Sequence, residues 1–303
     1  MKVSYIDHMG SDLSVVNAAR VSFGKESDWD YKCVCDRGPC APDCPYGEKQ
    51  LSKGDKGLIQ FLARGCASKD WESLLRDAAC RGELWISTDE VPSTGRIRYE
   101  EVLNHIRRMP DHWTPFGHTA ITLHIKAPIF VARQLGKHQV GMVWNEVSRR
   151  YVTDEPEFYD PDEWRKAADS VKQGSSDETV SKIKGSIISH PFNHQTEKSH
   201  LVKVGRTKPG YYSIQKDYNI YLKVVKNIYE HLLQGGVCPE QARMVLPQSM
   251  YTEWYWTGNL YSFANVFKQR TDSHAQKEVQ DVAHQIGEII SPLYPESWKA
   301  LTQ

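Results

Sequence analysis

Two polar clusters stand on either side of a short apolar spacer. The first runs over Arg133–Gln139 and the second over Asn145–Tyr151, with Val140–Trp144 between them. Arginine offers a planar fork that suits phosphate, and serine and glutamine add neutral donors. The spacing predicts a turn that directs both clusters into one pocket for an anionic ligand. The alternative, which composition alone favours, is a solvated helix face with ion pairs between residues four apart.

A second polar set lies toward the end of the chain. Arg243 lies inside the largely apolar stretch Gln241–Pro247. An unpaired buried charge is costly, so we expect this arginine either to form a structural ion pair or to bind a ligand. Asn259 and Asn265 fall in a helical pattern, in which asparagine is a poor interior residue. They are therefore interpreted as amides that recognise a flat heterocycle. Asp272 is predicted to be the N-cap of the final helix.

Four cysteines follow one another closely as Cys33-x-Cys35-x4-Cys40-x3-Cys44. Four thiolates at this spacing can close a tetrahedral zinc site. The alternative is a reduced, cysteine-rich loop. The segment 27–50 around them is predicted to be an inserted loop.

Composition excludes several classes of protein. The 303 residues carry 38 basic and 38 acidic side chains, and this balance argues against nucleic acid as a partner. No run approaches the roughly 20 apolar residues of a membrane span, and the first residues lack the pattern of a signal peptide. Seven cysteines without an export signal indicate a reducing compartment, which we expect to be the cytoplasm. The GxGxxG, P-loop, HExxH and GxSxG motifs are absent.

Alternating and helical patterns predict the elements that must position these residues. Strands are expected over 2–6, 118–126 and 248–256, and Asp12 is expected to cap a short helix. Helices are expected at the ranges 55–65, 70–82, 98–109, 211–234, 258–270 and 274–291. Strands and helices do not alternate regularly, so a parallel doubly wound sheet is not expected.

Several blocks, in order along the chain, resemble the flavin-dependent thymidylate synthases. Together they cover roughly half of the sequence. A single block would be weak evidence, but so many blocks in the family's order are not expected by chance. The blocks are Ala18–Gly24, His112–His118, Lys126–Gln134, Asn145–Tyr151, Ala242–Pro247, Tyr251–Asn259 and Arg270–Gln276.

This resemblance implies a fold and a reaction. The fold would be α+β, an antiparallel sheet flanked by helices, as a single domain over 1–303 with insertions near 27–50, 67–111 and 165–210. The reaction would be methylation of dUMP to dTMP, with methylenetetrahydrofolate as carbon donor, FAD as cofactor and NADPH as reductant. The enzymes are homotetramers with active sites where subunits meet, and they use no cysteine nucleophile.

The resemblance also implies residue roles, position by position. Flavin contacts would come from Ser22, His112, Thr114, Lys137, His138, Gln139, Glu146, Asn259 and Asn265. Nucleotide contacts would come from Gln134, Glu146, Ser148, Arg149, Arg150, Arg243 and Arg270. The residues nearest the chemistry would be Arg270, His138 and Ser148.

The chain departs from the family signature, which is Arg-His-Arg, seven residues and then Ser. Here Lys137, His138 and Gln139 are followed by eight residues before Ser148, a variant reminiscent of virus-encoded members. We hypothesise that Arg149 or Arg133 supplies the missing charge. Three functions stay open: thymidylate synthesis, another C5 modification such as hydroxymethylation or use of dCMP, and an inactive nucleotide-binding homologue.

Overall fold

The computed structural model describes residues 1–33, 47–64, 112–167, 175–184 and 211–303. The predicted helices at 70–82 and 98–109 lie outside these residues, as do Cys35, Cys40 and Cys44 of the predicted zinc site. The predicted insertion at 67–111 lies wholly outside the described residues, and those at 27–50 and 165–210 are described only in part. The single-domain prediction therefore stays a prediction.

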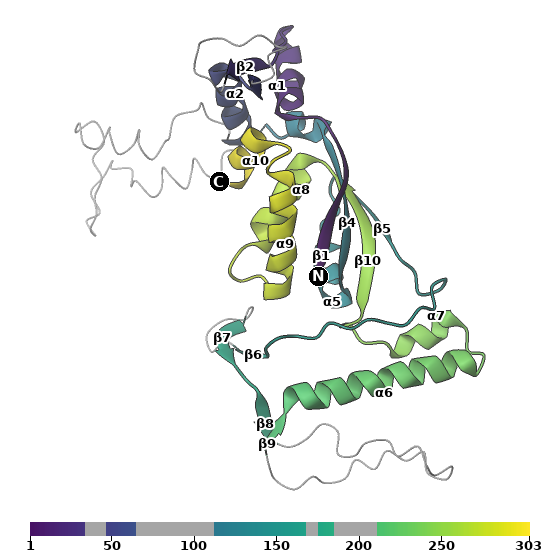
Figure 1. The fold of residues 1–303 in the computed structure, drawn as a ribbon. Helices are drawn as coiled ribbons and strands as arrows, with labels where there is room; N and C mark the ends of the chain where they lie inside the picture. Colours follow the sequence, from purple (N-terminus) through teal and green to yellow (C-terminus); the bar gives the residue numbers. More distant parts are fainter. Residues whose placement is uncertain (34–46, 65–111, 168–174, 185–210) are drawn as a thin grey trace, which may run out of the picture.

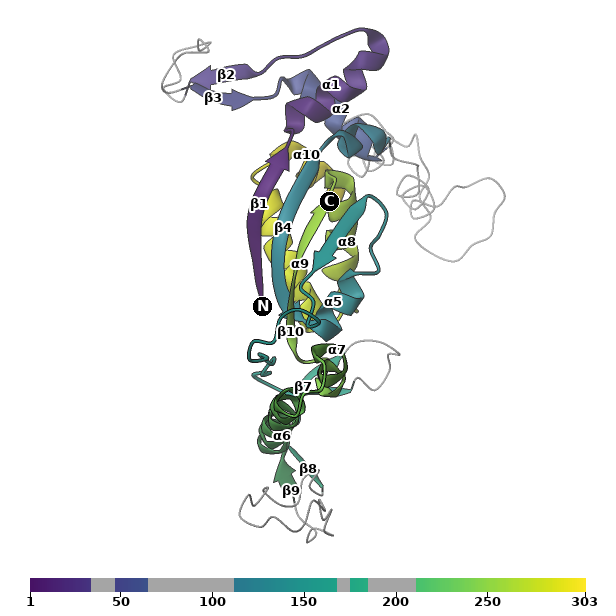
Figure 2. The ribbon, with the colours of Figure 1, turned by 90° about the vertical axis from the view of Figure 1, so that its right-hand side faces the viewer.

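A four-stranded antiparallel sheet forms the centre, in the order β1-β4-β10-β5. Figure 2 shows the strands side by side, with α8 and α9 behind them. The strands are β1 (Lys2–Met9), β4 (Ala120–Pro128), β5 (Met142–Glu146) and β10 (Tyr251–Gly258). The antiparallel sheet with flanking helices confirms the predicted α+β fold.

The core forms because apolar and polar side chains alternate along β4. Ile121, Leu123 and Ile125 are buried, whereas Thr122 and His124 face the other way and are partly exposed. On the buried side, β4 and its neighbours pack against α5 (Ile129–Leu135), α8 (Leu260–Arg270) and α9 (Lys277–Ile290). The period of two in this strand therefore decides which face of the sheet the helices cover.

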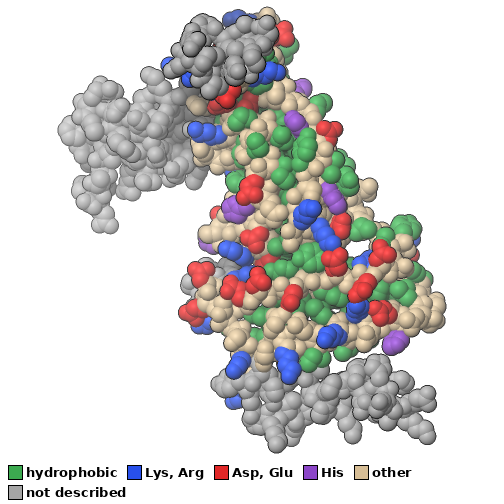
Figure 3. Space-filling model, in the orientation of Figure 1, with side chains coloured by type: hydrophobic (Ala, Val, Ile, Leu, Met, Phe, Trp, Pro, Cys, Tyr) green, Lys and Arg blue, Asp and Glu red, His purple; other side chains and the backbone are tan. Residues whose placement is uncertain are grey.

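Smaller elements extend both ends of the sheet (Figure 1). Near the end where β4 begins lie α1 (Asp12–Arg20), η1 (Val21–Phe23), β2 (Asp30–Cys33), β3 (Gly47–Gln50), α2 (Lys53–Arg64), η2 (Thr114–His118) and α10 (Pro295–Thr302). Toward the opposite end lie β6 (Arg165–Ala167), β7 (Ser175–Thr179), β8 (Lys182–Lys184), β9 (Tyr211–Ser213), α6 (Ile214–Gln234), α7 (Pro239–Ala242) and η3 (Arg243–Val245). Figure 3 shows acidic and basic side chains interspersed around α6, in keeping with the zero net charge.

Two capping predictions are wrong. Asp12 is the first residue of α1 rather than its cap, and its carboxylate accepts hydrogen bonds from the amides of Glu296 and Ser297, both at 2.9 Å. It thus caps α10, which packs on α1 and lies far away in the sequence. Asp272 does not cap α9, which begins at Lys277; its carboxylate accepts from the amide of His274 instead.

The spacer between the two polar clusters is also different from the prediction. Met142–Glu146 is a strand, β5, which pairs with β10 from Met142 opposite Gly258 to Glu146 opposite Trp254. The predicted turn is confined to the residues before it, where the amide of Met142 donates to the carbonyl of Gln139. Pairing with a strand more than 100 residues away outweighs the local pattern.

Candidate active site

Helix α8 holds the segment 134–142 against the sheet. At its end, the Arg270 guanidinium donates through Nε to His138 Nε2 and through Nη2 to the carbonyl of Gln134, both at 2.9 Å. Near its start, Ser262 Oγ donates to the carbonyl of Val140 at 2.9 Å. One helix therefore fixes both the first polar cluster and the first residue of the spacer that follows it.

His138 is neutral in this arrangement. Burial, and then the positive charge of Arg270, lower the pKa of His138 from 6.5 to about 4. Because Nε2 accepts a hydrogen bond from Arg270, the proton of the neutral ring is on Nδ1. His138 thus orients the arginine and offers one N–H donor of its own.

One cavity in the described part of the chain measures about 1140 Å³. It lies between α5, the α8–α9 connection and the segment before β6. Its polar wall includes Gln134, Lys137, Arg270 and Gln276, and the Gln134 side-chain amide donates to Gln276 Oε1 at 2.6 Å. This wall offers cations and amides to an anionic ligand with a polar ring.

The opposite wall of this cavity is aromatic and rests on a buried ion pair. Tyr159, Trp164 and Tyr218 line it. Arg165 Nη2 lies 2.7 Å from Glu278 Oε1, with the Glu278 side chain only 6% exposed. Burial alone would raise the pKa of Glu278, but the bonds from Arg165 and other donors outweigh it and hold that pKa below its usual value. None of these residues is in the predicted set. The sequence shows that these residues are aromatic or charged. It does not show that they line this cavity, because they lie outside the motifs.

Glu146 stands between two smaller cavities. One, of about 640 Å³, is also lined by Arg133, Lys137, His138 and Gln139. The other, of about 570 Å³, is lined by Glu146 with Arg149 and Arg243, among other residues. Glu146 Oε1 accepts from Thr252 Oγ1 at 2.6 Å, which fixes the carboxylate at the boundary.

The basic residues of the second polar cluster lie on the surface. Arg150 pairs with Glu240 at 3.0 Å, and Arg149 donates to the carbonyl of Asp154. Ser148 Oγ accepts from the amide of Arg150 at 3.3 Å. Arg243 is exposed, so the interpretation of a charge buried in an apolar turn is wrong. A single η3 turn is too short to bury it.

The predicted flavin residues outside the segment 137–146 divide into two groups. Ser22 and Thr114 lie on η1 and η2, near α1, which packs on η2; His112 stacks on Phe61 with ring centroids 5.3 Å apart. Asn259 and Asn265 lie on α8 or at its start.

Asn259 has a different role from the predicted interior amide. It is the N-cap of α8, and its Oδ1 accepts from the amide of Ser262 at 2.8 Å. The amide nitrogen faces Gly141, where an added Cβ would lie 2.8 Å from Asn259 Nδ2. Asn265 is inside α8, as predicted, and its side chain is half-buried.

Thus Gln134, Lys137, His138 and Arg270 meet around one segment, and Gln139 and Glu146 share a cavity with Lys137 and His138. The remaining predicted residues lie at other cavities or surfaces. Across the described residues, no cluster of three or more potential metal ligands occurs, and no helix is long and apolar enough to cross a membrane.

The family model described as "Thymidylate synthase complementing protein" matches residues 4–296. A relative from Thermus thermophilus, named flavin-dependent thymidylate synthase, is 33% identical over 301 residues, covering 99% of this chain and 75% of its own. One of the same name from Thermosipho melanesiensis is 38% identical over 184 residues, covering 61% of this chain and 68% of its own.

Among solved structures, a UMP/dUMP methylase, PolB, from Streptomyces cacaoi has the same fold, with a TM-score of 0.58 and 24% identity. The likeness covers 99% of this chain and 94% of that one. The family match spans nearly the whole chain and agrees with the α+β fold. The chain therefore belongs to the flavin-dependent thymidylate synthase family.

Proposed function

We propose that this protein methylates dUMP to dTMP, with methylenetetrahydrofolate as carbon donor and NADPH as reductant. The transfer balances: the donor's methylene carbon and one hydride form the methyl group, the C5 proton of dUMP and one proton from solvent go to the two folate nitrogens, and tetrahydrofolate and NADP⁺ are released. The observation that carries the proposal is the arrangement of Arg270 on the cavity wall, oriented by His138 and by the Gln134 carbonyl.

We infer that the pyrimidine ring lies against Gln134 and Arg270. A charged guanidinium beside a ring carbonyl stabilises negative charge that develops on the ring during attack by C5. His138 is neutral and cannot compete for that charge, which supports its role in orienting Arg270. Half-buried Arg149 and exposed Arg150 and Arg243 would hold the phosphate, with Ser148 as a neutral donor.

FAD is the cofactor we propose, and the donor set fits it. Hydroxyls on Ser22 and Thr114 and the amide nitrogen of Asn259 can donate to phosphate or ring edges. When bound, the flavin supplies the hydride. Arg133 shares a cavity with Lys137 and Gln139, whereas Arg149 lines a different one, so of the two we favour Arg133 as the compensating charge.

We propose a homotetramer in the cytoplasm, with active sites between subunits. The support is that, within one chain, the candidate residues lie apart from one another. They are distributed over three cavities and the surface around η1 and η2. Residues that serve one ligand but do not meet in one chain can meet across an interface. Size-exclusion chromatography with light scattering measures this directly, and a monomer with full activity would contradict it.

The proposed reaction is tested with purified protein, dUMP, methylenetetrahydrofolate, NADPH and FAD. We expect dTMP by chromatography, and free flavin in the supernatant after heat denaturation. A parallel reaction with dCMP, and mass analysis for a hydroxymethyl product, test the alternative chemistry. Failure to bind FAD, or absence of any modified nucleotide from reconstituted protein, would refute the proposed function.

The cysteine-rich segment stays a proposed structural zinc site. Cys33 ends β2, and its partners lie outside the described residues. Elemental analysis should find one zinc per chain, and activity should not depend on a cysteine nucleophile. A metal-free, fully active protein would contradict the zinc proposal.

A further inference from the structure

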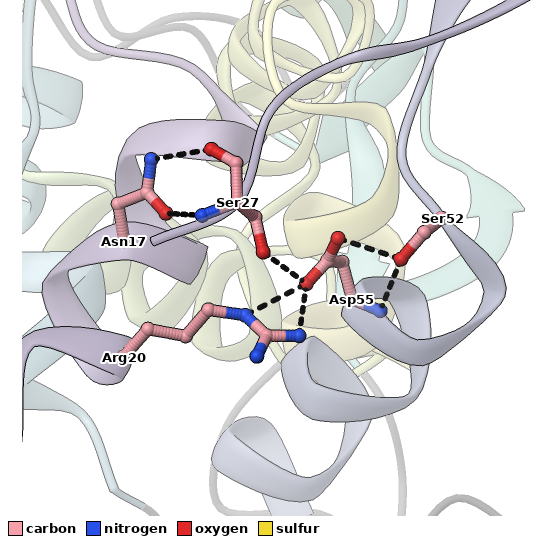
Figure 4. Close-up of polar contacts among 5 residues, drawn as sticks. All are labelled: Asn17, Arg20, Ser27, Ser52 and Asp55. Carbon is pink, nitrogen blue, oxygen red and sulfur yellow. Dashed lines mark hydrogen bonds and ion pairs between the residues drawn. The ribbon is translucent and has the colours of Figure 1, made fainter. Parts of the chain in front are cut away.

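A single buried carboxylate accepts hydrogen bonds from three side chains near η1 (Figure 4). Asp55, on α2, is 2% exposed. Its Oδ1 accepts from Arg20 Nε at 2.9 Å, from Arg20 Nη2 at 2.5 Å and from Ser27 Oγ at 2.9 Å. Its Oδ2 accepts from Ser52 Oγ at 2.6 Å. The Asp55 amide in turn donates to Ser52 Oγ at 3.1 Å.

These partners come from three directions. Arg20 is the last residue of α1, Ser27 precedes β2, and Ser52 follows β3. Asn17 reinforces the same junction, because its side chain exchanges two hydrogen bonds with the backbone of Ser27, at 2.8 and 3.0 Å. Asp55 therefore joins α2 to the end of α1 and to both ends of the β2–β3 hairpin.

The segment that this junction closes is the exposed turn 21–26. Ser22 is at its tip, between Val21 and Phe23, which are 71% and 77% exposed. Gly24 has a left-handed φ of +59° and closes the turn with its amide on the Val21 carbonyl. A turn with such exposed apolar side chains has few contacts of its own to hold it. Its geometry must come from its ends.

Charge is essential in this network. Burial alone would raise the pKa of Asp55, but the bonds from Ser52, Arg20 and Ser27 outweigh it and lower that pKa. The carboxylate is thus ionised at neutral pH and accepts from every neighbouring side chain. An amide at the same position would present two N–H donors to groups that already donate, and would leave the Arg20 guanidinium without its partner.

We propose that Asp55 is a positioning residue for flavin binding: through Arg20 and Ser27 it sets the turn that presents Ser22 to the cofactor. This inference rests on the proposed function, because it takes FAD as the ligand of Ser22. Asp55 itself does not contact the flavin. Its carboxylate reduces the number of conformations that the turn can adopt, so less entropy is lost when the ligand binds.

The test is a double-mutant cycle on FAD affinity, measured by fluorescence titration of apoprotein. Asp55→Asn and Ser22→Ala should each weaken FAD binding, roughly tenfold for Asp55→Asn, as when a partner that orients a binding group is lost. In the double variant, Asp55→Asn should add little to Ser22→Ala, because its effect passes through Ser22. Additive losses would refute the positioning role.

Three further measurements separate positioning from general damage. Asp55→Glu keeps the charge and should recover part of the affinity. Asp217→Asn, at a buried aspartate on α6, is the matched control and should leave FAD affinity unchanged. Affinity for dUMP should be the same in Asp55→Asn as in wild type, and an equal loss of both ligands would overturn the proposal.

If Asp55→Asn does not fold, as judged by near-UV circular dichroism, Ser27→Ala takes its place in the cycle. It removes one donor to Asp55 and leaves the ion pair with Arg20. Wild-type FAD affinity in Ser27→Ala would then refute the proposal. If the proposed function itself is wrong, the titration gives a different result: wild-type apoprotein binds no FAD at all.

Discussion

Lowering the pH should break the contact between His138 and Arg270. The pKa of His138 is about 4 in the folded protein and 6.5 in its unperturbed state. Between these values the unfolded chain binds a proton that the folded chain does not, so this histidine destabilises the fold as the pH decreases from 6.5 toward 4. Above pH 6.5 its effect is absent, because both states are neutral.

The size of the effect follows from the pKa difference. A pKa of 6.5 against about 4 corresponds to at most about 3.4 kcal/mol. At about pH 5 the linkage is incomplete and solvent screens the partly exposed ring, so we expect about 1–2 kcal/mol. His138→Gln is the informative variant: its side-chain oxygen can accept from Arg270, and it does not titrate.

The assay is urea unfolding followed by circular dichroism at pH 7 and pH 5. Wild type should lose about 1–2 kcal/mol more free energy of unfolding between the two pH values than His138→Gln does. His231→Gln, at an exposed histidine on α6, is the matched control and should behave like wild type. Equal pH dependence in wild type and His138→Gln would show that His138 is not held neutral by burial and Arg270.

Three other perturbations test the remaining parts of the site. Arg150→Ala and Arg243→Ala should each weaken dUMP binding by about 1.5–3 kcal/mol, the usual loss for a charge-assisted bond, with little effect on FAD; calorimetric titration with both ligands measures this. Glu278→Gln leaves the Arg165 guanidinium without its carboxylate, so it should cost about 3 kcal/mol of stability, visible as a lower Tm. Gly141→Ala should lower the Tm and weaken FAD binding, because φ is +70° there and the new Cβ would lie 2.5 Å from Ser262 Oγ; a stable variant with normal affinity would contradict the tight turn.

The sequence predicts the elements whose patterns are local. The alternation of β4 and the long helical pattern of α9 are visible without a structure, because each follows from one face being buried. β5 and the capping of α10 by Asp12 are not predictable in this way, because both depend on partners more than 100 residues away. Helix α10 itself is absent from the predicted elements.

The candidate site shows the same division. Residue types at the motifs predict that Gln134, His138 and Arg270 bind a polar ligand, but not that Arg270 Nε would donate to His138 across 132 positions. The sequence-based interpretation of Asn259 as a ligand-binding amide rests on the poor propensity of asparagine for helix interiors. In the structure Asn259 is the N-cap of α8, a position at which asparagine is favoured. The aromatic wall with Arg165 and Glu278 carries no motif at all.

The structure also indicates where the extra residue of the variant signature is accommodated. Helix α5 ends at Leu135, and β5 pairs in register with β10 from Met142 onward, without a bulge. If this pairing is kept, an added residue before β5 lengthens the segment 136–141. Gly141 adopts a left-handed φ of +70° there, and Ser262 fixes the carbonyl of Val140 just before it. Because β5 and α8 hold both sides of this turn, the insertion need not displace Glu146 or Arg270. The altered signature is therefore compatible with a preserved nucleotide wall, and its consequences should be concentrated in the cavity shared by Lys137, His138 and Gln139.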